Sequence, residues 1–223
     1  MKSMGSTIFK LRTPICPKLA LLLVVVLHYY AIASFGSDPD PVQDFCIPTT
    51  GIVGCKNSSA ATVDDFVFSG IKFPGKFGET GLSAQPVNVN GFPGLNTLGM
   101  SFVRADFEVG GINVPHFHPR ATEIAFVLEG SIYSGFVDTN NRIYAKVIEK
   151  GEVMVFPRGL LHFQMNVGDK PATIFGSFDS QNPGLIRVPN AVFGAGIEGK
   201  LLEKAFGLNS KEIAKLKRKF APH

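Results

Sequence analysis

The chain has 223 residues, of which 45% are hydrophobic and 18% are charged, a composition typical of one globular domain. Its formal net charge is +4, but the first 36 residues hold four of the 22 basic residues and none of the 18 acidic ones. The remainder carries equal numbers of positive and negative side chains, so its charge does not support nucleic acid or another polyanion as a partner.

The first 36 residues have the pattern of a secretory signal peptide. A basic start is followed by the apolar run LALLLVVVL at 19–27 and then by small residues. A membrane anchor is the alternative, but this run is well short of the roughly 20 apolar residues that a spanning helix needs. We therefore expect a secreted protein without a membrane span, cleaved after Gly36 or, alternatively, after Ala33.

Two features follow the predicted leader. Cys46 and Cys55 remain after Cys16 is lost with the leader, and an even pair in an oxidising compartment predicts a disulfide bond. In the chain-entropy model this bond stabilises the N-terminal arm by roughly 2 to 3 kcal/mol. Asn57 opens the only N-x-S/T sequon of the sequence and is the expected glycosylation site, although such sites are often unoccupied.

The middle of the chain is predicted to be all-β. Residues 38–99 are rich in Gly, Pro, Asn and Asp, which favours loops and edge strands. Residues 98–188 contain short runs of β-branched and aromatic residues bounded by turn residues at a spacing of about ten, typical of an antiparallel sandwich or closed barrel. The segment DTNNR at 138–142 is expected to form a hairpin turn.

The C-terminal end alone has helical periodicity. Helices are predicted at 199–207 and 209–220, with Asn209 as N-cap and Glu212 in the reciprocal position. The basic residues at 215–219 are interpreted as a solvated helix face rather than a nucleic-acid patch. We expect one domain at 37–223, divided into a disulfide arm at 37–60, a barrel at about 61–190 and helices at about 197–220.

The stretch GGINVPHFHPRATEIAFVLEG at 110–130 contains a possible metal site. His116 and His118 are two residues apart, so on a strand both point to the same side. Glu123 is an odd number of residues from His118 and would face the other way on an unbroken strand. Pro119 cannot donate to a β-ladder, which predicts a turn or bulge that resets the alternation.

A second stretch, GEVMVFPRGLLHFQMNVG at 151–168, has a polar and an apolar face. The polar face consists of His162, Gln164 and Asn166, and the apolar face consists of Phe163, Met165 and Val167. The pattern predicts that the polar face lines an interior cavity while the other face belongs to an apolar packing layer. His162 is then a third imidazole available to the same cavity.

The three histidines favour a metal site over ordinary core packing. His28 lies in the leader and His223 is the last residue, so every other histidine belongs to the proposed cluster. Any one of them alone is better read as a satisfied core histidine, but three together with Glu123 form a ligand set. Imidazole and carboxylate donors without thiolate suit Mn(II), Fe(II), Ni(II) or Zn(II). The resulting local charge of about +1 would attract small anions such as superoxide or a carboxylate.

Both stretches resemble the two cupin motifs. The matching residues are Gly110, His116, His118, Glu123 and Gly130 in the first motif and Gly151, Pro157, Gly159, His162 and Asn166 in the second. The segments SDPDPVQDFC, PGLNTLGMSFVRADF, HFHPRATEI, FPRGLLHFQMNVG and FDSQNPG resemble the germins and germin-like proteins of plants. This resemblance implies a cupin jelly-roll β-barrel, a manganese ion held by the three histidines and Glu123, export to the cell wall or apoplast, and a homohexamer built as a trimer of dimers.

The resemblance implies several functions. We expect a manganese superoxide dismutase, in which Asn113, Gln164 or Asn166 orient water or relay protons, unless they only satisfy backbone groups. Oxalate oxidase is the alternative, but of the two asparagines thought to hold oxalate in the family, one matches Asn113 and the other aligns with Val103. An apolar side chain there forfeits about 1 to 3 kcal/mol of hydrogen bonding. A non-catalytic extracellular binding or structural protein, stabilised by its metal, is the third interpretation.

Overall fold

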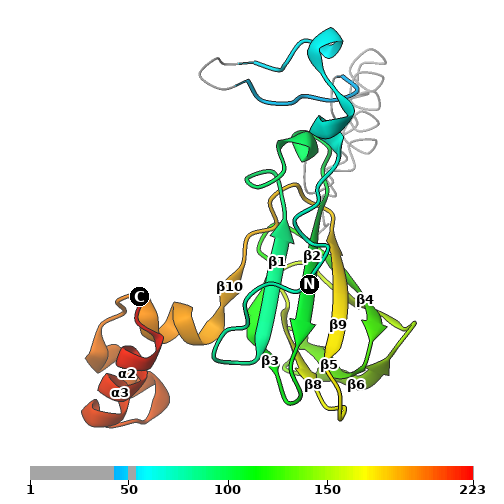
Figure 1. Ribbon diagram of the computed structural model, residues 1–223. Helices are drawn as coiled ribbons and strands as arrows, with labels where there is room; N and C mark the ends of the chain where they lie inside the picture. Colours follow the sequence, from blue (N-terminus) through cyan, green and yellow to red (C-terminus); the bar gives the residue numbers. More distant parts are fainter. Residues whose placement is uncertain (1–42, 50–53, 223) are drawn as a thin grey trace, which may run out of the picture. The chain divides into compact units, whose positions relative to one another are not determined.

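The described part of the chain contains ten β-strands in two antiparallel sheets, which confirms the predicted all-β fold (Figure 1). The structure is a computed structural model that describes residues 43–49 and 54–222. The predicted signal peptide and both candidate cleavage sites lie outside the described residues. Within those residues, no helix is long and apolar enough to cross a membrane.

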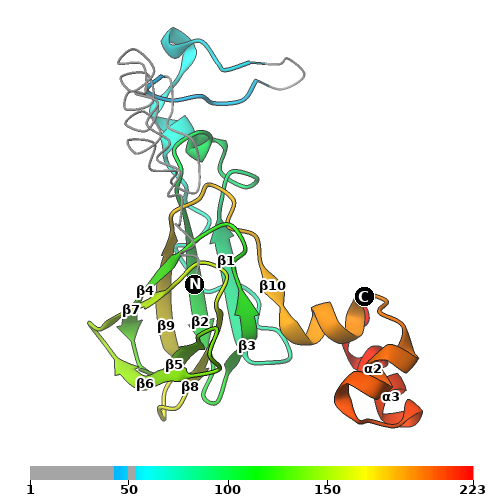
Figure 2. The same ribbon diagram turned by 180° about the vertical axis from the view of Figure 1, so that it is seen from behind.

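Each sheet has five strands. The first has the order β1 (Leu82–Val87), β2 (Ser101–Phe107), β9 (Ala172–Phe178), β4 (Glu123–Glu129) and β7 (Val153–Phe156). The second has the order β10 (Ile186–Arg187), β3 (Ile112–Phe117), β8 (Leu161–Asn166), β5 (Ser131–Val137) and β6 (Ile143–Glu149) (Figure 2).

The hydrophobic core lies between the two sheets, because both contribute to it. Its buried members are Ala105, Phe107, Ala125, Val127, Ile132, Ile148, Phe156, Ala172 and Ile174. Alternation along β4 is strict: Ala125 and Val127 are buried, whereas Ile124 and Phe126 are exposed. The period of two that the sequence predicts therefore selects the core face of this strand.

The predicted hairpin turn at 138–142 joins β5 to β6. The carboxylate of Asp138 accepts hydrogen bonds from the backbone N–H groups of Asn140 and Arg142, at 2.8 and 2.9 Å. Asn141 adopts a left-handed backbone conformation, with φ of 60°, which asparagine tolerates better than most residues. Local turn chemistry thus sets the register of these two strands.

The connecting segments contain short helices that the sequence analysis did not anticipate. These are the 3-10 helices η1 (Ser58–Ala60), η2 (Val63–Phe66) and η3 (Pro93–Leu95) and the π-helix η4 (Asn190–Gly194). Each has three to five residues, which is too short to produce a hydrophobic period. Their ends are marked by capping residues: the side chain of Asn57 caps η1, and a capping box of Thr62 and Asp65 begins η2.

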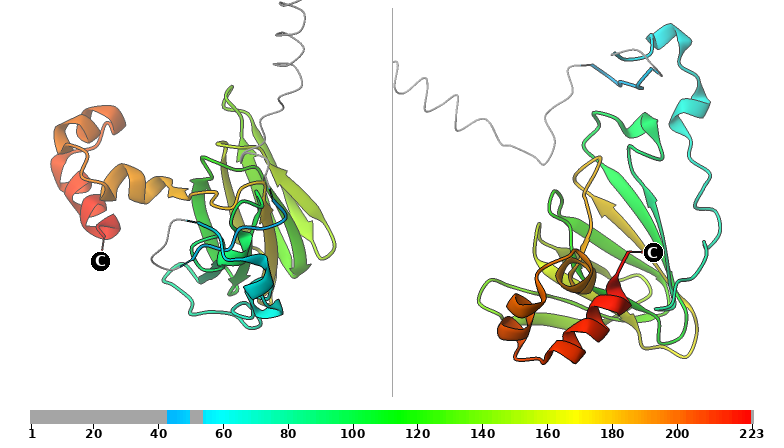
Figure 3. Two further views of the ribbon diagram at one scale, coloured as in Figure 1. Left: turned by 90° about the horizontal axis from the view of Figure 1, so that it is seen from above. Right: turned by 90° about the vertical axis from the view of Figure 1, so that its left-hand side faces the viewer.

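The C-terminal helices agree with the prediction to within one residue. They are α2 (Gly199–Phe206) and α3 (Ser210–Phe220), which lie side by side (Figure 3). Asn209 accepts hydrogen bonds from the first turn of α3 and Glu212 accepts one from the backbone of Asn209, so the predicted capping box is present. Each helix has one buried residue, Leu202 in α2 and Ile213 in α3.

The disulfide bond between Cys46 and Cys55 is present, with Cα atoms 4.8 Å apart. The side-chain amide of Asn96 donates to the carbonyl of Cys46 at 2.7 Å, which ties this arm to the segment before β2. Asn57 is exposed, and its Oδ1 accepts from the backbone N–H and hydroxyl of Ser59. The amide nitrogen that would carry a glycan takes no part in those two bonds.

Candidate metal centre

A β-bulge in β3 shapes one side of the site. Asn113 pairs with Gln164 and His116 pairs with His162, so three steps along β3 match two steps along β8. An unbroken strand would place Asn113 and His116 on opposite faces, because they are an odd number of residues apart. The extra residue at the bulge brings both side chains to the interior, which simple alternation does not predict.

A turn between β3 and β4 brings Glu123 to the same interior. β3 ends at Phe117, β4 begins at Glu123, and the two strands belong to different sheets. The turn is held by hydrogen bonds from the Arg120 N–H to the Pro183 carbonyl and from the Thr122 N–H to the Asp179 carboxylate. The break expected at Pro119 is therefore a change of sheet, and it resets the alternation as predicted.

Each of the three histidines has its ring orientation set by a backbone carbonyl. Nδ1 of His116 lies 2.8 Å from the Val114 carbonyl, Nδ1 of His162 lies 2.8 Å from the Leu160 carbonyl, and Nδ1 of His118 contacts the Gly184 carbonyl. A carbonyl oxygen can only accept, so each Nδ1 carries the proton and donates it. In a neutral ring, Nε2 then carries no proton and can bind a ligand.

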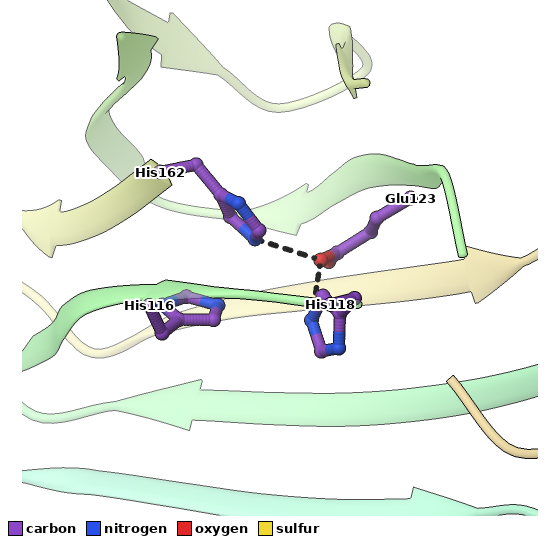
Figure 4. Close-up of side chains that lie close together, drawn as sticks. All are labelled: His116, His118, Glu123 and His162. Atoms are coloured by element: carbon purple, nitrogen blue, oxygen red, sulfur yellow. Dashed lines mark ion pairs between the residues drawn. The ribbon is translucent and has the colours of Figure 1, made fainter. Parts of the chain in front are cut away.

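These four side chains converge on one point (Figure 4). One donor atom from each of His116, His118, Glu123 and His162 lies within 4.8 Å of the others, and all four residues are buried. Oε2 of Glu123 is 3.2 Å from Nε2 of His118 and 3.3 Å from Nε2 of His162.

Electrostatics keeps the carboxylate charged and one imidazole neutral. Burial raises the pKa of Glu123, but the imidazoles of His118 and His162 beside its carboxylate more than offset this effect and lower that pKa to about 2. Burial, reinforced by the neighbouring His162, lowers the pKa of His116 to about 3. At neutral pH the pocket therefore presents a carboxylate together with a neutral imidazole, the protonation states that a metal ion requires.

The donor atoms fit a divalent metal ion. Oε2 of Glu123 and Nε2 of His162 are both buried and lack a hydrogen-bond partner by strict geometry, even though they lie 3.3 Å apart. In a neutral ring whose Nδ1 carries the proton, Nε2 is an acceptor like Oε2, so no hydrogen bridges the two atoms. A cation satisfies both at once, and nitrogen and oxygen donors without thiolate suit the harder divalent transition metals.

The cluster opens into a cavity of about 420 Å³. Its walls include Val103, Ile174 and Phe178 from the first sheet, which are apolar, and Asn113 and Gln164 from the second sheet, which are polar. The segment from Asn182 to Arg187 lines the cavity as well, and Arg187 adds a cationic side chain. The volume is in the range of sites for small organic molecules.

The three candidate polar residues take different places. The Asn113 amide donates to Oε1 of Gln164 at 2.9 Å and lies 3.4 Å from Nε2 of His116, so this amide pair sits beside the ligands. Asn166 is buried but does not belong to the cavity lining. Its amide donates to the carbonyls of Glu108 and Lys170, and its Oδ1 accepts from the Gly168 N–H, which fixes the turn after β8.

Sequence reasoning missed several residues that support the ligands. The ring of Phe156 stacks on His162 with centroids 4.5 Å apart and planes 12° apart, and Phe178 packs against His118. Arg120 donates from Nε to the Asn182 carbonyl at 2.8 Å, which steadies the loop whose Gly184 carbonyl accepts from His118. None of these residues has a sequence signature, because each acts through a contact with a different strand or loop.

Comparison with known proteins agrees with this architecture. Residues 69–214 match the cupin family. The chain is 54% identical to germin-like protein subfamily 3 member 2 of Arabidopsis thaliana, over 91% of this chain and 94% of that protein. It is 44% identical to the rhicadhesin receptor of Pisum sativum, over 92% and 99% of the two chains. A solved oxalate oxidase in complex with the substrate analogue glycolate superposes with a TM-score of 0.79 at 40% identity, covering 82% of this chain and 98% of that one.

A cupin fold with a buried cluster of three histidines and one glutamate defines the class of protein. At this level of identity over nearly its whole length, the chain belongs to the germin-like proteins of the cupin family.

Proposed function

We propose that this chain is a secreted germin-like protein that binds manganese through His116, His118, Glu123 and His162 and dismutates superoxide. The observation that carries the metal site is that one donor atom from each of the three histidines and Glu123 lies within 4.8 Å of the others, in a buried cluster. The oxygen and nitrogen donors are compatible with manganese, which the family resemblance favours over the other divalent ions.

The bound ion would supply one-electron redox chemistry, in which two superoxide anions and two protons become dioxygen and hydrogen peroxide. The protein's part is to draw the anion in and to place it. The ligand set leaves a net charge of about +1, and Arg187 adds positive charge to the cavity lining. The amide pair of Asn113 and Gln164 lies where it can orient water or the anion beside the ion.

Dismutation is tested on purified protein whose manganese content has been measured. We expect superoxide removal per bound ion well above that of the same concentration of free manganese, and none from a Glu123→Gln variant prepared in parallel. Activity no greater than that of free manganese in a fully loaded sample would refute the proposed enzyme.

Oxalate oxidation is the second candidate, supported by the similarity to the oxalate oxidase structure. Against it stands Val103, which lines the cavity and cannot hydrogen-bond a carboxylate. We expect little peroxide from oxalate in the natural protein. A Val103→Asn variant should raise this activity by about tenfold or more, because one hydrogen bond to a charged group contributes about 1.5 to 3 kcal/mol.

The matched control for that prediction is Val103→Ala. It enlarges the cavity without adding a polar group, so it should leave the oxalate activity unchanged. Equal gains in oxalate activity in the two variants would mean that the larger cavity, and not the added amide, causes the effect. Strong oxalate activity in the natural protein, abolished by His162→Ala, would reverse the ranking of the two functions.

A non-catalytic binding or structural role is the third candidate, and the similarity to a protein named as a receptor supports it. Protein that loads metal and gains stability from it, but turns over neither superoxide nor oxalate, would favour this role.

We further propose the domain limits and assembly that the resemblance implies. The first 36 residues would be a leader removed on export to the apoplast, leaving one domain at 37–223 with a glycan at Asn57. Mass spectrometry of protein secreted by a eukaryotic host tests the new N-terminus and the glycan together. A sample that begins at Met1 would contradict export.

The proposed homohexamer, a trimer of dimers, draws support from exposed apolar side chains on both sheets. On the first sheet Ile124 pairs with Val155 and Phe126 with Val153, and all four are exposed. On the second, Val147, Tyr133 and Met165 form an exposed row across three strands. Contiguous apolar patches of this kind mark interaction surfaces, and light scattering of the purified protein measures the number of subunits.

A further inference from the structure

Gly176 occupies a position in the first sheet where a larger residue would be expected. It lies within β9, between Val103 of β2 and Ala125 of β4, and it is buried. Glycine weakens a strand interior, because it has no side chain to pack and loses more conformational entropy on folding. Its φ is not in the left-handed region, so the backbone conformation does not call for glycine.

The space above Gly176 is already filled by two other side chains. A methyl group placed on its Cα would lie 2.7 Å from Oε1 of Glu123 and 2.7 Å from a γ-methyl group of Val103. Both distances are shorter than real contacts of a β-carbon. The missing side chain at 176 therefore makes the room in which the carboxylate end of Glu123 lies beside Val103.

The two carboxylate oxygens of Glu123 have different neighbours, and the space above Gly176 accommodates one of them. Oε2 of Glu123 lies 3.2 and 3.3 Å from Nε2 of His118 and His162, while Oε1 is the atom above Gly176. We propose that Gly176 is a positioning residue of the metal centre: the absence of a side chain leaves room for Oε1 of Glu123, so that the carboxylate presents Oε2 to the ion. This inference rests on the proposed metal site and concerns how that site is held in place.

The two neighbours would respond differently to an added methyl group. Val103 is β-branched and stiff at χ1, and it is fixed within β2. Glu123 has three side-chain torsions and begins its strand, so its carboxylate is the group that gives way. Both contacts at 2.7 Å involve side chains and not backbone. Gly176→Ala should therefore displace the carboxylate of Glu123, while its contact with the stiff Val103 side chain lowers stability and is removed in a Val103→Ala background.

The test uses the full-length secreted protein, stripped of metal with a chelator and titrated with Mn(II). We expect Gly176→Ala to weaken manganese binding by about 10- to 100-fold, the loss typical of groups that orient metal ligands. The electron paramagnetic resonance spectrum of bound Mn(II) should change, and in a Val103→Ala background, where only the Glu123 contact remains, Gly176→Ala should leave the melting temperature in chelator unchanged.

Gly135→Ala is the matched control, because it also adds a methyl group to a glycine inside a strand. That methyl group would collide with the side chain of Ala145 and with the backbone carbonyl of Tyr144, away from the cavity. We expect a lower melting temperature in chelator, with manganese affinity and spectrum unchanged.

The outcomes are separable. Natural affinity and spectrum in Gly176→Ala would overturn the inference, whereas failure of the natural protein to bind manganese would overturn the metal site. If Gly176→Ala does not fold, the same substitution is made together with Val103→Ala, which leaves only the Glu123 contact. That double variant should bind manganese more weakly than Val103→Ala alone, and equal binding would reject the inference.

Discussion

A Glu123→Gln variant should fold normally and lose tight manganese binding. We expect affinity to fall by more than about 100-fold, because even groups that only orient metal ligands contribute about 10- to 100-fold. The substitution removes the one carboxylate among the four converging side chains and leaves a neutral amide in its place. Metal analysis after gel filtration and calorimetric titration of the metal-free protein measure this loss.

The metal-free form of the same variant should be less stable than the metal-free natural protein. In the natural protein, Oε2 of Glu123 lies 3.2 and 3.3 Å from Nε2 of His118 and His162, and these two imidazoles lower the pKa of Glu123 to about 2. A pKa below its usual value means that the fold stabilises the charged carboxylate, and a neutral amide loses that contribution. Glu129→Gln is the control, since Glu129 ends the same strand and is exposed. If Glu123→Gln retains full affinity, the carboxylate is not a ligand.

Removal of the metal should lower the melting temperature of the natural protein by roughly 8 to 16 °C. An ion present at about 1,000 times its dissociation constant adds about 4 kcal/mol to the free energy of unfolding. For a domain of about 150 to 250 residues, each kcal/mol corresponds to about 2 to 4 °C. Differential scanning calorimetry with and without a chelator that does not reduce the disulfide bond gives the shift directly.

The Glu123→Gln variant separates this effect from a general effect of the chelator. Its melting temperature should be the same with and without chelator, while Glu129→Gln should behave like the natural protein. A natural protein whose stability is indifferent to chelation would mean that the cluster does not hold its ion in the folded state, and dismutation through it would then have no basis.

The sequence alone was sufficient for the fold class, the four converging side chains and the disulfide bond. Alternation with a period of two decides which face of β4 and β8 is buried, because a strand turned over by one residue would expose its core side chains. His116 and His118 share a face by the same rule. The caps of α3 and the turn at 138–142 depend on residues only a few positions apart, so they too are predictable.

The details of the site depend on contacts between distant segments. The sequence of β3 alone does not predict the bulge that turns Asn113 inward, because the extra residue is defined only by the pairing of β3 with β8. The alternation of β8 places Asn166 on the same face as His162, yet its hydrogen bonds hold a turn instead of lining the cavity. The apolar face at Phe163, Met165 and Val167 follows the predicted alternation, but Met165 and Val167 remain 40% and 47% exposed in the single chain.

The sequence therefore determined which residues can face the interior, because that choice follows from the geometry of each strand. The tertiary structure decided which atoms meet there. The Gly184 carbonyl fixes the ring of His118, Phe156 stacks on His162, and the missing side chain of Gly176 leaves room for Glu123. Each of these contacts joins different strands or loops, and only the packing of the folded chain brings them within contact distance.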